Sequence, residues 1–194
     1  MILCKNYLKF KERQDITSFS VDRICEVACA EVESLIILCV YRPPASHLFT
    51  FLNIMEEILS KLCSNNKSIY ICGDFNINIL VDSIDKSKLL SLFRSFNLNY
   101  IFNEPTRITS TSLTCIDNIF TNGGVLNFNV IPGVRSDHMG QLVSIKAKSK
   151  LPLTKIITIR PLTNHVLNSF KNNATLNLCN KYSFSGAPNK DFNQ

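Results

Sequence analysis

The sequence lacks tryptophan, is poor in glycine and proline, and has no long hydrophobic run. Among its 194 residues there are 6 glycines, 7 prolines and no tryptophan. With 45% hydrophobic and 19% charged residues, this composition excludes a disordered, collagen-like or low-complexity chain. Since no apolar run approaches the roughly 18 to 20 residues that cross a bilayer, we expect no membrane span.

Features of secreted and zinc-binding proteins are also missing. Residues 1–5 contain too short an apolar stretch for a signal peptide, and no small-residue cleavage site follows them. None of the 8 cysteines forms a C-x-x-C pair, and most stand in apolar segments. We therefore expect an intracellular protein with buried, reduced thiols, and keep a disulfide framework or a zinc site as the alternative.

Positive charge is concentrated near the C-terminus. Residues 1–140 carry 13 lysines and arginines against 14 acidic residues, whereas residues 141–194 carry 8 against the single Asp191. A basic tail of this kind is suited to contacting phosphates. A solvated linker is the simpler interpretation.

The hydrophobic pattern predicts an α/β protein. Two β-branched-rich runs with little room between them indicate an antiparallel pair, and the second, apolar throughout, is expected to be a central strand buried on both faces. After Pro43 and Pro44, Ser46 can cap a helix in which apolar residues recur at spacings of four and three. The turn 122–124 predicts that the two strands beside it form a hairpin.

Strands that alternate with crossover helices indicate a sheet whose polar residues gather at strand ends. We treat residues 1–147 as one domain and residues 148–194 as a basic linker. The expected strands are 23–32, 34–41, 68–72, 116–121, 125–131 and 141–147, and the expected helices begin at Ser46 and Asp85, with a further helix at 164–170 and a polar loop at 103–114.

Ionisable and amide side chains stand directly beside the ends of these strands. Two acids, an amide and a histidine suffice for metal-assisted phosphodiester hydrolysis, in which carboxylates hold Mg²⁺, another carboxylate orders the attacking water, and histidine stabilises phosphate charge or moves a proton. The residues concerned are Tyr41, Asp74, Asn76, Asp117, Asp137 and His138.

Each of these residues also has a purely structural interpretation. The segment 73–76, Gly-Asp-Phe-Asn, is a plausible turn, because aspartate and asparagine favour turn positions. Asp117 fits the end of a strand, His138 fits an ordinary surface position, and Tyr41 fits a strand-end aromatic. Taken singly, none of them specifies a function.

Taken in order and spacing, five short strings are specific. They resemble the endonuclease/exonuclease/phosphatase superfamily and, within it, the apurinic-type endonuclease domain of jockey-like non-LTR (LINE-type) retrotransposons. The resemblance covers roughly residues 1–147. The strings are 40–44 (VYRPP), 71–76 (ICGDFN), 104–107 (EPTR), 116–120 (IDNIF) and 136–138 (SDH).

The resemblance implies a role for each catalytic position. Asp74 matches the carboxylate that orients or deprotonates the attacking water, and Asn76 matches the amide that helps to hold that water and the phosphate. Asp137 matches a metal-binding carboxylate. His138 matches the imidazole beside the scissile phosphate, and Asp117 matches the carboxylate that pairs with it.

The resemblance also implies substrate contacts, a cofactor and a fold. Tyr41 matches a phosphate-contacting tyrosine, and Thr106 and Arg107 fall in a loop near DNA. The implied cofactor is Mg²⁺, with Mn²⁺ as the substitute. The implied fold is a four-layer α/β sandwich, two mixed sheets flanked by helices, which in this chain lacks its first strands.

The sequence departs from the family at its start. The family's domain opens with one strand that bears an asparagine and another that bears a metal-binding glutamate, both upstream of the VYRPP string. Neither is matched here, and Glu26, Glu31 and Glu33 lie in or beside a strand pair instead. We therefore expect a chain shortened by roughly 60 to 80 residues, with poor Mg²⁺ affinity.

The leading hypothesis is a retrotransposon endonuclease that nicks DNA with Mg²⁺, impaired by truncation, whose full-length element carries a reverse transcriptase in cis. Such an enzyme acts in the nucleus on genomic DNA. The first alternative is a non-catalytic remnant that binds nucleic acid through its basic tail. The second is a phosphatase of the same superfamily acting on phosphoinositides or another lipid headgroup, which fits the VYRPP and EPTR strings less well.

Overall fold

The computed structural model describes residues 1–64, 66–133, 136–146, 165 and 167–173. The chain divides into two units, Met1–Ser149 and Lys150–Gln194. In the second unit, residue 165 and residues 167–173 are helical and exposed, and the other positions of the expected helix at 164–170 lie outside the described residues.

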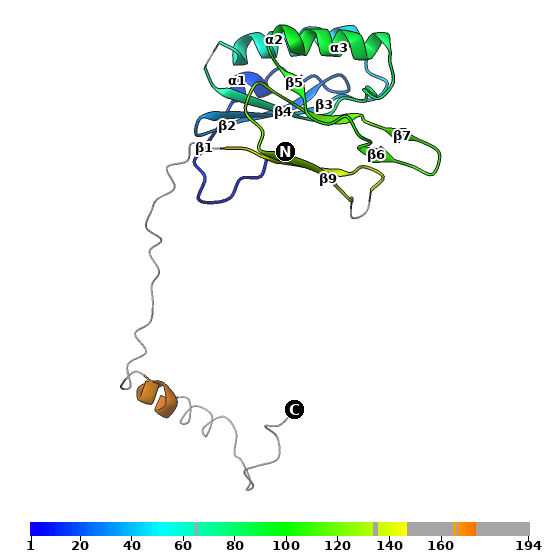
Figure 1. The fold of residues 1–194 in the computed structure, drawn as a ribbon. Helices are drawn as coiled ribbons and strands as arrows, with labels where there is room; N and C mark the ends of the chain where they lie inside the picture. The colour runs from blue at the N-terminus through cyan, green and yellow to red at the C-terminus, as the bar shows by residue number, and fades with distance from the viewer. Residues whose placement is uncertain (65, 134–135, 147–164, 166, 174–194) are drawn as a thin grey trace. The chain divides into compact units, whose positions relative to one another are not determined.

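A six-stranded mixed sheet forms the centre of this unit (Figure 1). Its strand order is β1-β2-β3-β4-β8-β5, and β3 and β4 run parallel while the other pairs are antiparallel. The strands are β1 (Phe10–Glu12), β2 (Glu26–Val32), β3 (Leu35–Tyr41), β4 (Ser68–Asp74), β8 (Asp117–Thr121) and β5 (Asn99–Tyr100).

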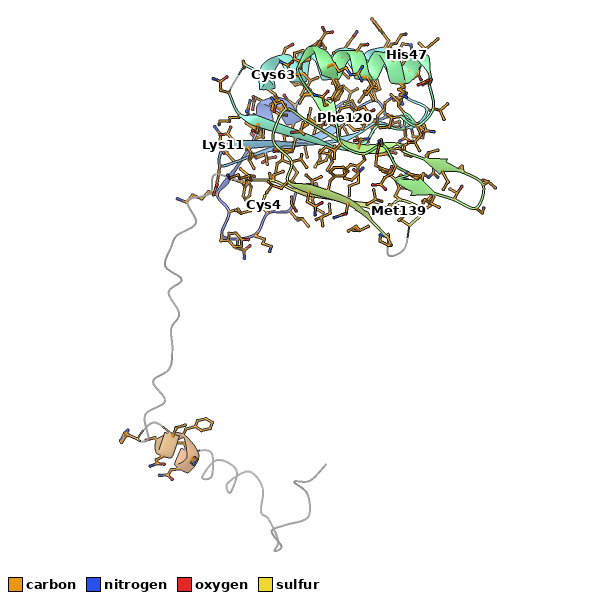
Figure 2. The ribbon with its side chains drawn as sticks, in the orientation of Figure 1. Cys4, Lys11, His47, Cys63, Phe120 and Met139 are labelled. Carbon is orange, nitrogen blue, oxygen red and sulfur yellow. The ribbon has the colours of Figure 1, made fainter. Side chains whose placement is uncertain are left out.

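Helices cover one face of this sheet (Figure 1). They are α1 (Gln14–Thr17), α2 (Leu48–Leu62) and α3 (Ile84–Ser95), and α2 is the crossover that makes β3 and β4 parallel. The apolar stripe of α2 is buried against the sheet. The Phe93 ring of α3 packs on Phe120 of β8 with the ring centroids 4.2 Å apart and the ring planes tilted by 45°. Figure 2 shows Phe120 on the side of the sheet that the helices cover. This packing confirms the predicted amphipathic helices.

Two details of the predicted elements are wrong. The cap of α2 is His47, and Ser46 precedes it with its backbone carbonyl accepting from the Arg42 guanidinium at 2.8 Å. Strand β3 is central, as predicted, but it alternates between buried and half-buried residues, so it is fully buried on the helical face only.

A two-stranded antiparallel sheet packs on the other face (Figure 1). It consists of β9 (Asn127–Ile131) and β10 (Gly140–Ser144). Val130 and Val143 of this sheet and Ile119 of β8 pack against one small buried cluster of Ile79, Phe102 and Cys115. The predicted hairpin between the strands at 116–121 and 125–131 is wrong, because β8 pairs with β4 and β5 while β9 pairs with β10.

A short hairpin of β6 (Arg107–Ile108) and β7 (Leu113–Thr114) replaces the middle of the expected polar loop. In residues 1–146, apart from the undescribed positions 65, 134 and 135, the layers are therefore helices, a mixed sheet and a small antiparallel sheet. The mixed α/β class is confirmed.

In the described residues, no helix is long and apolar enough to span a membrane.

Candidate active site

Three neighbouring strands end at the same place on the sheet. In the register of the sheet, Tyr41 of β3 stands beside Asp74 of β4, and Asp74 stands beside Asp117 of β8. Gly73 allows the close approach of β4 to β3, because a Cβ at this position would lie 1.8 Å from the Val40 carbonyl oxygen. The sheet thus brings together three side chains that lie far apart in the sequence.

The segment after β4 is both a turn and part of this site. Asp74 Oδ1 accepts a hydrogen bond from the backbone N–H of Asn76 at 2.9 Å, the contact of an Asx-turn. Asn76 has a φ of 49°, in the left-handed region that asparagine tolerates better than most residues. Its side-chain Nδ2 donates to the Arg42 carbonyl at 2.7 Å, which fixes the amide beside Asp74.

Arg42 supports this turn from below the surface. Its side chain is 5% exposed, and its guanidinium donates to the carbonyls of Phe75 at 3.2 Å and Ser46 at 2.8 Å. Burial lowers the pKa of this guanidinium, although the carboxylates of Asp85 and Asp74 oppose the shift. Arg42 lies in the VYRPP string, yet the sequence analysis assigned it no role.

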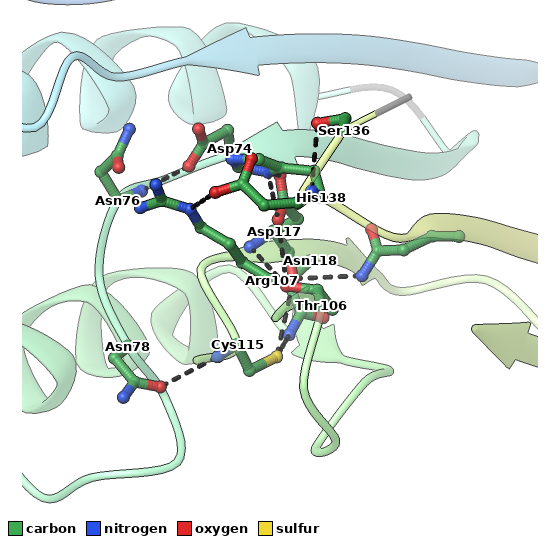
Figure 3. Close-up of polar contacts among 12 residues, drawn as sticks. Asp74, Asn76, Asn78, Thr106, Arg107, Cys115, Asp117, Asn118, Ser136 and His138 are labelled. Carbon is green, nitrogen blue, oxygen red and sulfur yellow. Dashed lines mark hydrogen bonds and ion pairs between the residues drawn. The ribbon is translucent and has the colours of Figure 1, made fainter. Parts of the chain in front are cut away.

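A hydrogen-bonded pair of an aspartate and a histidine forms the second half of the site (Figure 3). His138 Nδ1 donates to the Asp117 carboxylate, at 2.9 Å from Oδ2 and 3.1 Å from Oδ1. The Thr106 hydroxyl also donates to Asp117 Oδ2 at 3.0 Å. With Oδ2 thus shared by two donors, Asp117 holds the imidazole in one orientation.

The segments around Arg107 and His138 lie side by side, and this places His138 at the start of β8. Arg107 and His138 form an isolated antiparallel bridge, and the Met139 N–H donates to the Thr106 carbonyl at 2.6 Å. The Arg107 guanidinium also pairs with Asp137 at 2.7 Å, and this hydrogen bond lowers the pKa of Asp137.

The half-buried side chains of Asp74, Asp117 and His138 offer ligand atoms that all lie within 4.8 Å of one another. Burial raises the pKa of Asp74 above its ordinary value of 3.8, and the nearby Asp117 carboxylate acts in the same direction. Two carboxylates and an imidazole at this spacing form a donor set that can hold a divalent cation or share a proton.

A family model described as endonuclease-reverse transcriptase matches residues 35–141. The chain belongs to this family. The match spans every site residue described above, and it confirms the resemblance to the endonuclease/exonuclease/phosphatase superfamily and its retrotransposon endonucleases. No match to a curated protein sequence was found.

Solved structures with the same fold agree with the family. The endonuclease domain of TRAS1, a telomere-specific non-LTR retrotransposon, is 15% identical and superposes with a TM-score of 0.60 over 75% of this chain and 72% of its own. A 3′ phosphatase from Neisseria, solved with a product DNA hairpin, is 15% identical with a TM-score of 0.53, over 62% of this chain and 65% of its own. A 3′-5′ exonuclease from Neisseria meningitidis is 14% identical with a TM-score of 0.52 and the same coverage. These likenesses show the fold, which in those proteins carries nuclease or phosphatase activity.

The surroundings of three sequence-predicted residues differ in this family member. Thr106, predicted to lie near DNA, is fully buried, and its hydroxyl donates to Asp117 Oδ2, so a direct contact with DNA stays a prediction. Asp137, predicted to bind metal, lies outside the cluster of three, with its carboxylate on Arg107. Tyr41, by contrast, is 42% exposed at the strand end.

Two amides that the sequence analysis missed hold the backbone around the site. The buried Asn118 accepts from the N–H groups of Ile101 and Phe102 and donates to the Phe102 carbonyl at 2.7 Å. Asn78 accepts from the Cys115 N–H at 3.0 Å (Figure 3). Asn118 follows Asp117 directly, but its partners lie 16 to 17 positions away along the chain, so the neighbouring residues do not reveal its role.

The buried hydroxyl of Thr106 leads to a prediction. Thr106→Val keeps the shape but leaves the Asp117 N–H and carboxylate without this partner, so we expect the free energy of unfolding to fall by about 1 to 2 kcal/mol. Urea denaturation measures the change. Thr111→Val, at an exposed position of the β6–β7 hairpin, is the matched control, and an equal loss in both variants would contradict the role given to Thr106.

Proposed function

We propose that this chain nicks DNA by hydrolysing a phosphodiester bond with water as the nucleophile and a divalent cation as cofactor. The observation that carries the proposal is the Asp117–His138 pair, held at 2.9 Å beside Asp74 in a member of the endonuclease-reverse transcriptase family. Hydrolysis by this set needs no covalent enzyme intermediate, because one group can order water while another meets the phosphate.

Each polar group has a task in this proposal. Asp74, whose Oδ1 is already fixed by the Asn76 N–H, orients the attacking water and takes its proton on the other oxygen. The Asn76 amide holds water and phosphate. His138 faces the phosphate with Nε2 while Asp117 holds its Nδ1. Tyr41, which ends the neighbouring protein strand β3, contacts a phosphate oxygen of the DNA.

The donor set fits a hard divalent cation. Carboxylate oxygens of Asp74 and Asp117 lie close together, and the raised pKa of Asp74 reflects a charge that burial leaves poorly compensated. When bound, Mg²⁺ or Mn²⁺ stabilises the charge that develops on the phosphate oxygens. We propose that Asp137, whose carboxylate pairs with Arg107 in this structure, would hold the cation beside the carboxylates of Asp74 and Asp117, and that Arg107 contacts the DNA backbone.

Conversion of supercoiled plasmid to the open-circular form tests the proposal. We expect nicking with Mg²⁺ or Mn²⁺ and none with EDTA. Nicking that persists in EDTA would contradict a metal-dependent mechanism. The non-catalytic alternative predicts DNA binding without nicking, a steep loss of binding with salt, and no change in Asp74→Ala.

Loss of the imidazole is the second test. We expect His138→Ala to lower the nicking rate by about 10² to 10⁴-fold, because it removes the group that meets the phosphate, while the half-buried position keeps the fold intact. His47→Ala, which removes an exposed imidazole at the cap of α2, is the matched control and should nick as the parent does. Full activity in His138→Ala would refute the assigned role.

The same proposal extends to the remainder of the chain. We propose residues 1–147 as the nuclease domain and residues 148–194 as a basic connection to a reverse transcriptase in cis, on the support of the family's description. DNA is the proposed partner, and the nucleus the proposed place of action on genomic DNA.

A further inference from the structure

Two cysteines face each other on the central parallel pair of strands. Cys39 of β3 and Cys72 of β4 are register partners, and their sulfurs lie 3.5 Å apart. Both are free thiols and both are half-buried. The Cys72 sulfur also lies 3.6 Å from the Leu38 carbonyl, a contact that turns it toward β3.

The backbone spacing at this pair matches that of a disulfide. Neighbouring strands lie about 4.8 Å apart, so the Cα atoms of register partners fall within the roughly 4.4 to 6.8 Å that disulfides span. The sulfurs are already within van der Waals contact. Small rotations of the two side chains therefore suffice to form the bond, and no strand has to move.

Reagents can reach the pair from one side. Cys39 and Cys72 line an open hollow of about 620 Å³ between β2, β3 and β4, far larger than a peroxide molecule. Three other cysteines of the described chain, Cys25, Cys29 and Cys115, are buried. Burial raises the pKa of Cys29 and Cys115 to about 11, which leaves them as inert thiols.

We propose that Cys39 and Cys72 form a reversible disulfide that serves as an oxidation site of this protein. With hydrogen peroxide as oxidant, one sulfur attacks the O–O bond, which gives a sulfenic acid and water. The second sulfur then attacks the first, so that the S–S bond forms, the S–O bond breaks and a second water leaves. Two thiols and one peroxide thus give one disulfide and two waters.

The position of the pair links it to the candidate active site. Cys39 lies two residues before Tyr41 on β3, and Cys72 lies two residues before Asp74 on β4. Since side chains two apart on a strand point to the same face, the bridge joins the two strands on the face that presents Tyr41 and Asp74.

Peptide mapping without reduction tests the proposal directly, on the full chain after brief treatment with peroxide. We expect a cross-linked peptide pair that contains Cys39 and Cys72, and its loss on addition of dithiothreitol. The Cys72→Ser variant should lose the cross-link, and Cys63→Ser, at a half-buried cysteine on the end of α2, should keep it. Absence of the Cys39–Cys72 peptide in the parent chain, or cross-linking of either residue mainly to another cysteine, would overturn the proposal.

A thermal measurement separates a bridge formed in the folded state from one formed after unfolding. The bond closes a loop of about 34 residues, so the oxidised chain should melt roughly 5 to 10 °C higher than the reduced chain. Cys72→Ser should show no such difference. A lower melting temperature after bridging would contradict the geometric match.

Discussion

Replacing Asp74 by asparagine is expected to lower nicking by about 10² to 10⁴-fold and at the same time to raise the melting temperature of the chain. Activity falls because asparagine cannot take a proton from water. Stability rises because burial raises the pKa of Asp74, which means that its charged form is unfavourable in the folded state. The variant removes that charge while keeping the size of the side chain.

The pH dependence follows from the direction of this shift. The folded chain holds the Asp74 proton more tightly than the unfolded chain, whose carboxyl titrates near 3.8. The contribution of Asp74 to stability is therefore fully present below that value and is lost as the pH rises through the higher pKa of the folded state. The difference in stability between parent and Asp74→Asn should be largest at neutral pH and shrink in acid.

Thermal melts at several pH values, alongside the plasmid assay, measure both effects. Asp22→Asn is the matched control, because this carboxylate is almost fully exposed beside Arg23 and should change neither activity nor stability. A destabilised Asp74→Asn at neutral pH would show that the carboxylate contributes more through its contact with the Asn76 N–H than its burial costs.

Replacing Arg42 by alanine is expected to lower the free energy of unfolding by about 3 kcal/mol, the largest change in stability that we predict. The substitution leaves the carbonyls of Phe75 and Ser46 without their donor and opens a cavity beside Phe51, over whose ring the guanidinium lies at 5.8 Å. Arg42→Lys should recover only part of the loss, because an ammonium cannot reproduce the fork of the guanidinium.

Urea denaturation of both variants measures this effect, with Arg94→Ala as the matched control. Arg94 is exposed in the last turn of α3, and its removal should change stability by less than about 0.5 kcal/mol. If Arg42→Ala and Arg94→Ala unfold at the same urea concentration, Arg42 does not support the turn after β4.

Local sequence was sufficient to predict the strands that end at the site and the helix that connects β3 with β4. Their hydrophobic periodicity is a property of neighbouring residues. The polar residues that flank a strand lie at its end, and this placement does not depend on long-range contacts. The short strings around Asp74, Asp117 and His138 were informative for the same reason, because each holds several site residues within a few positions.

The predicted hairpin at 122–124 was wrong because residues of β4, which lie far away in the sequence, form hydrogen bonds with that turn. Asn122 Oδ1 accepts from the Ile69 N–H at 2.8 Å, and the Gly124 carbonyl accepts from the Tyr70 hydroxyl at 2.9 Å. These contacts tie the turn to β4, and β9 leaves in another direction to pair with β10. Turn propensity specifies that the chain bends, whereas long-range contacts decide which strand it meets next.

The supports of the site escaped prediction for a related reason. A buried arginine, a buried threonine and the buried Asn118 are ordinary polar residues in the sequence. Apart from the Ser46 carbonyl, four positions from Arg42, their partners are carbonyls and a carboxylate that lie from 11 to 33 positions away along the chain. No local pattern contains that information.

The candidate site assembles late during synthesis. Its first part depends on the parallel pairing of β3 with β4, and its last part depends on His138, which lies far along the sequence. Asp74 and its turn can form once α2 has crossed back to the sheet, but Asp117 and His138 follow 43 and 64 residues later. Pairings over such separations form slowly, since the intervening chain must be ordered first. A nascent chain that has left the ribosome only as far as α3 therefore lacks the Asp117–His138 pair, so the order of translation delays assembly of the proposed nuclease site until its last strands are made.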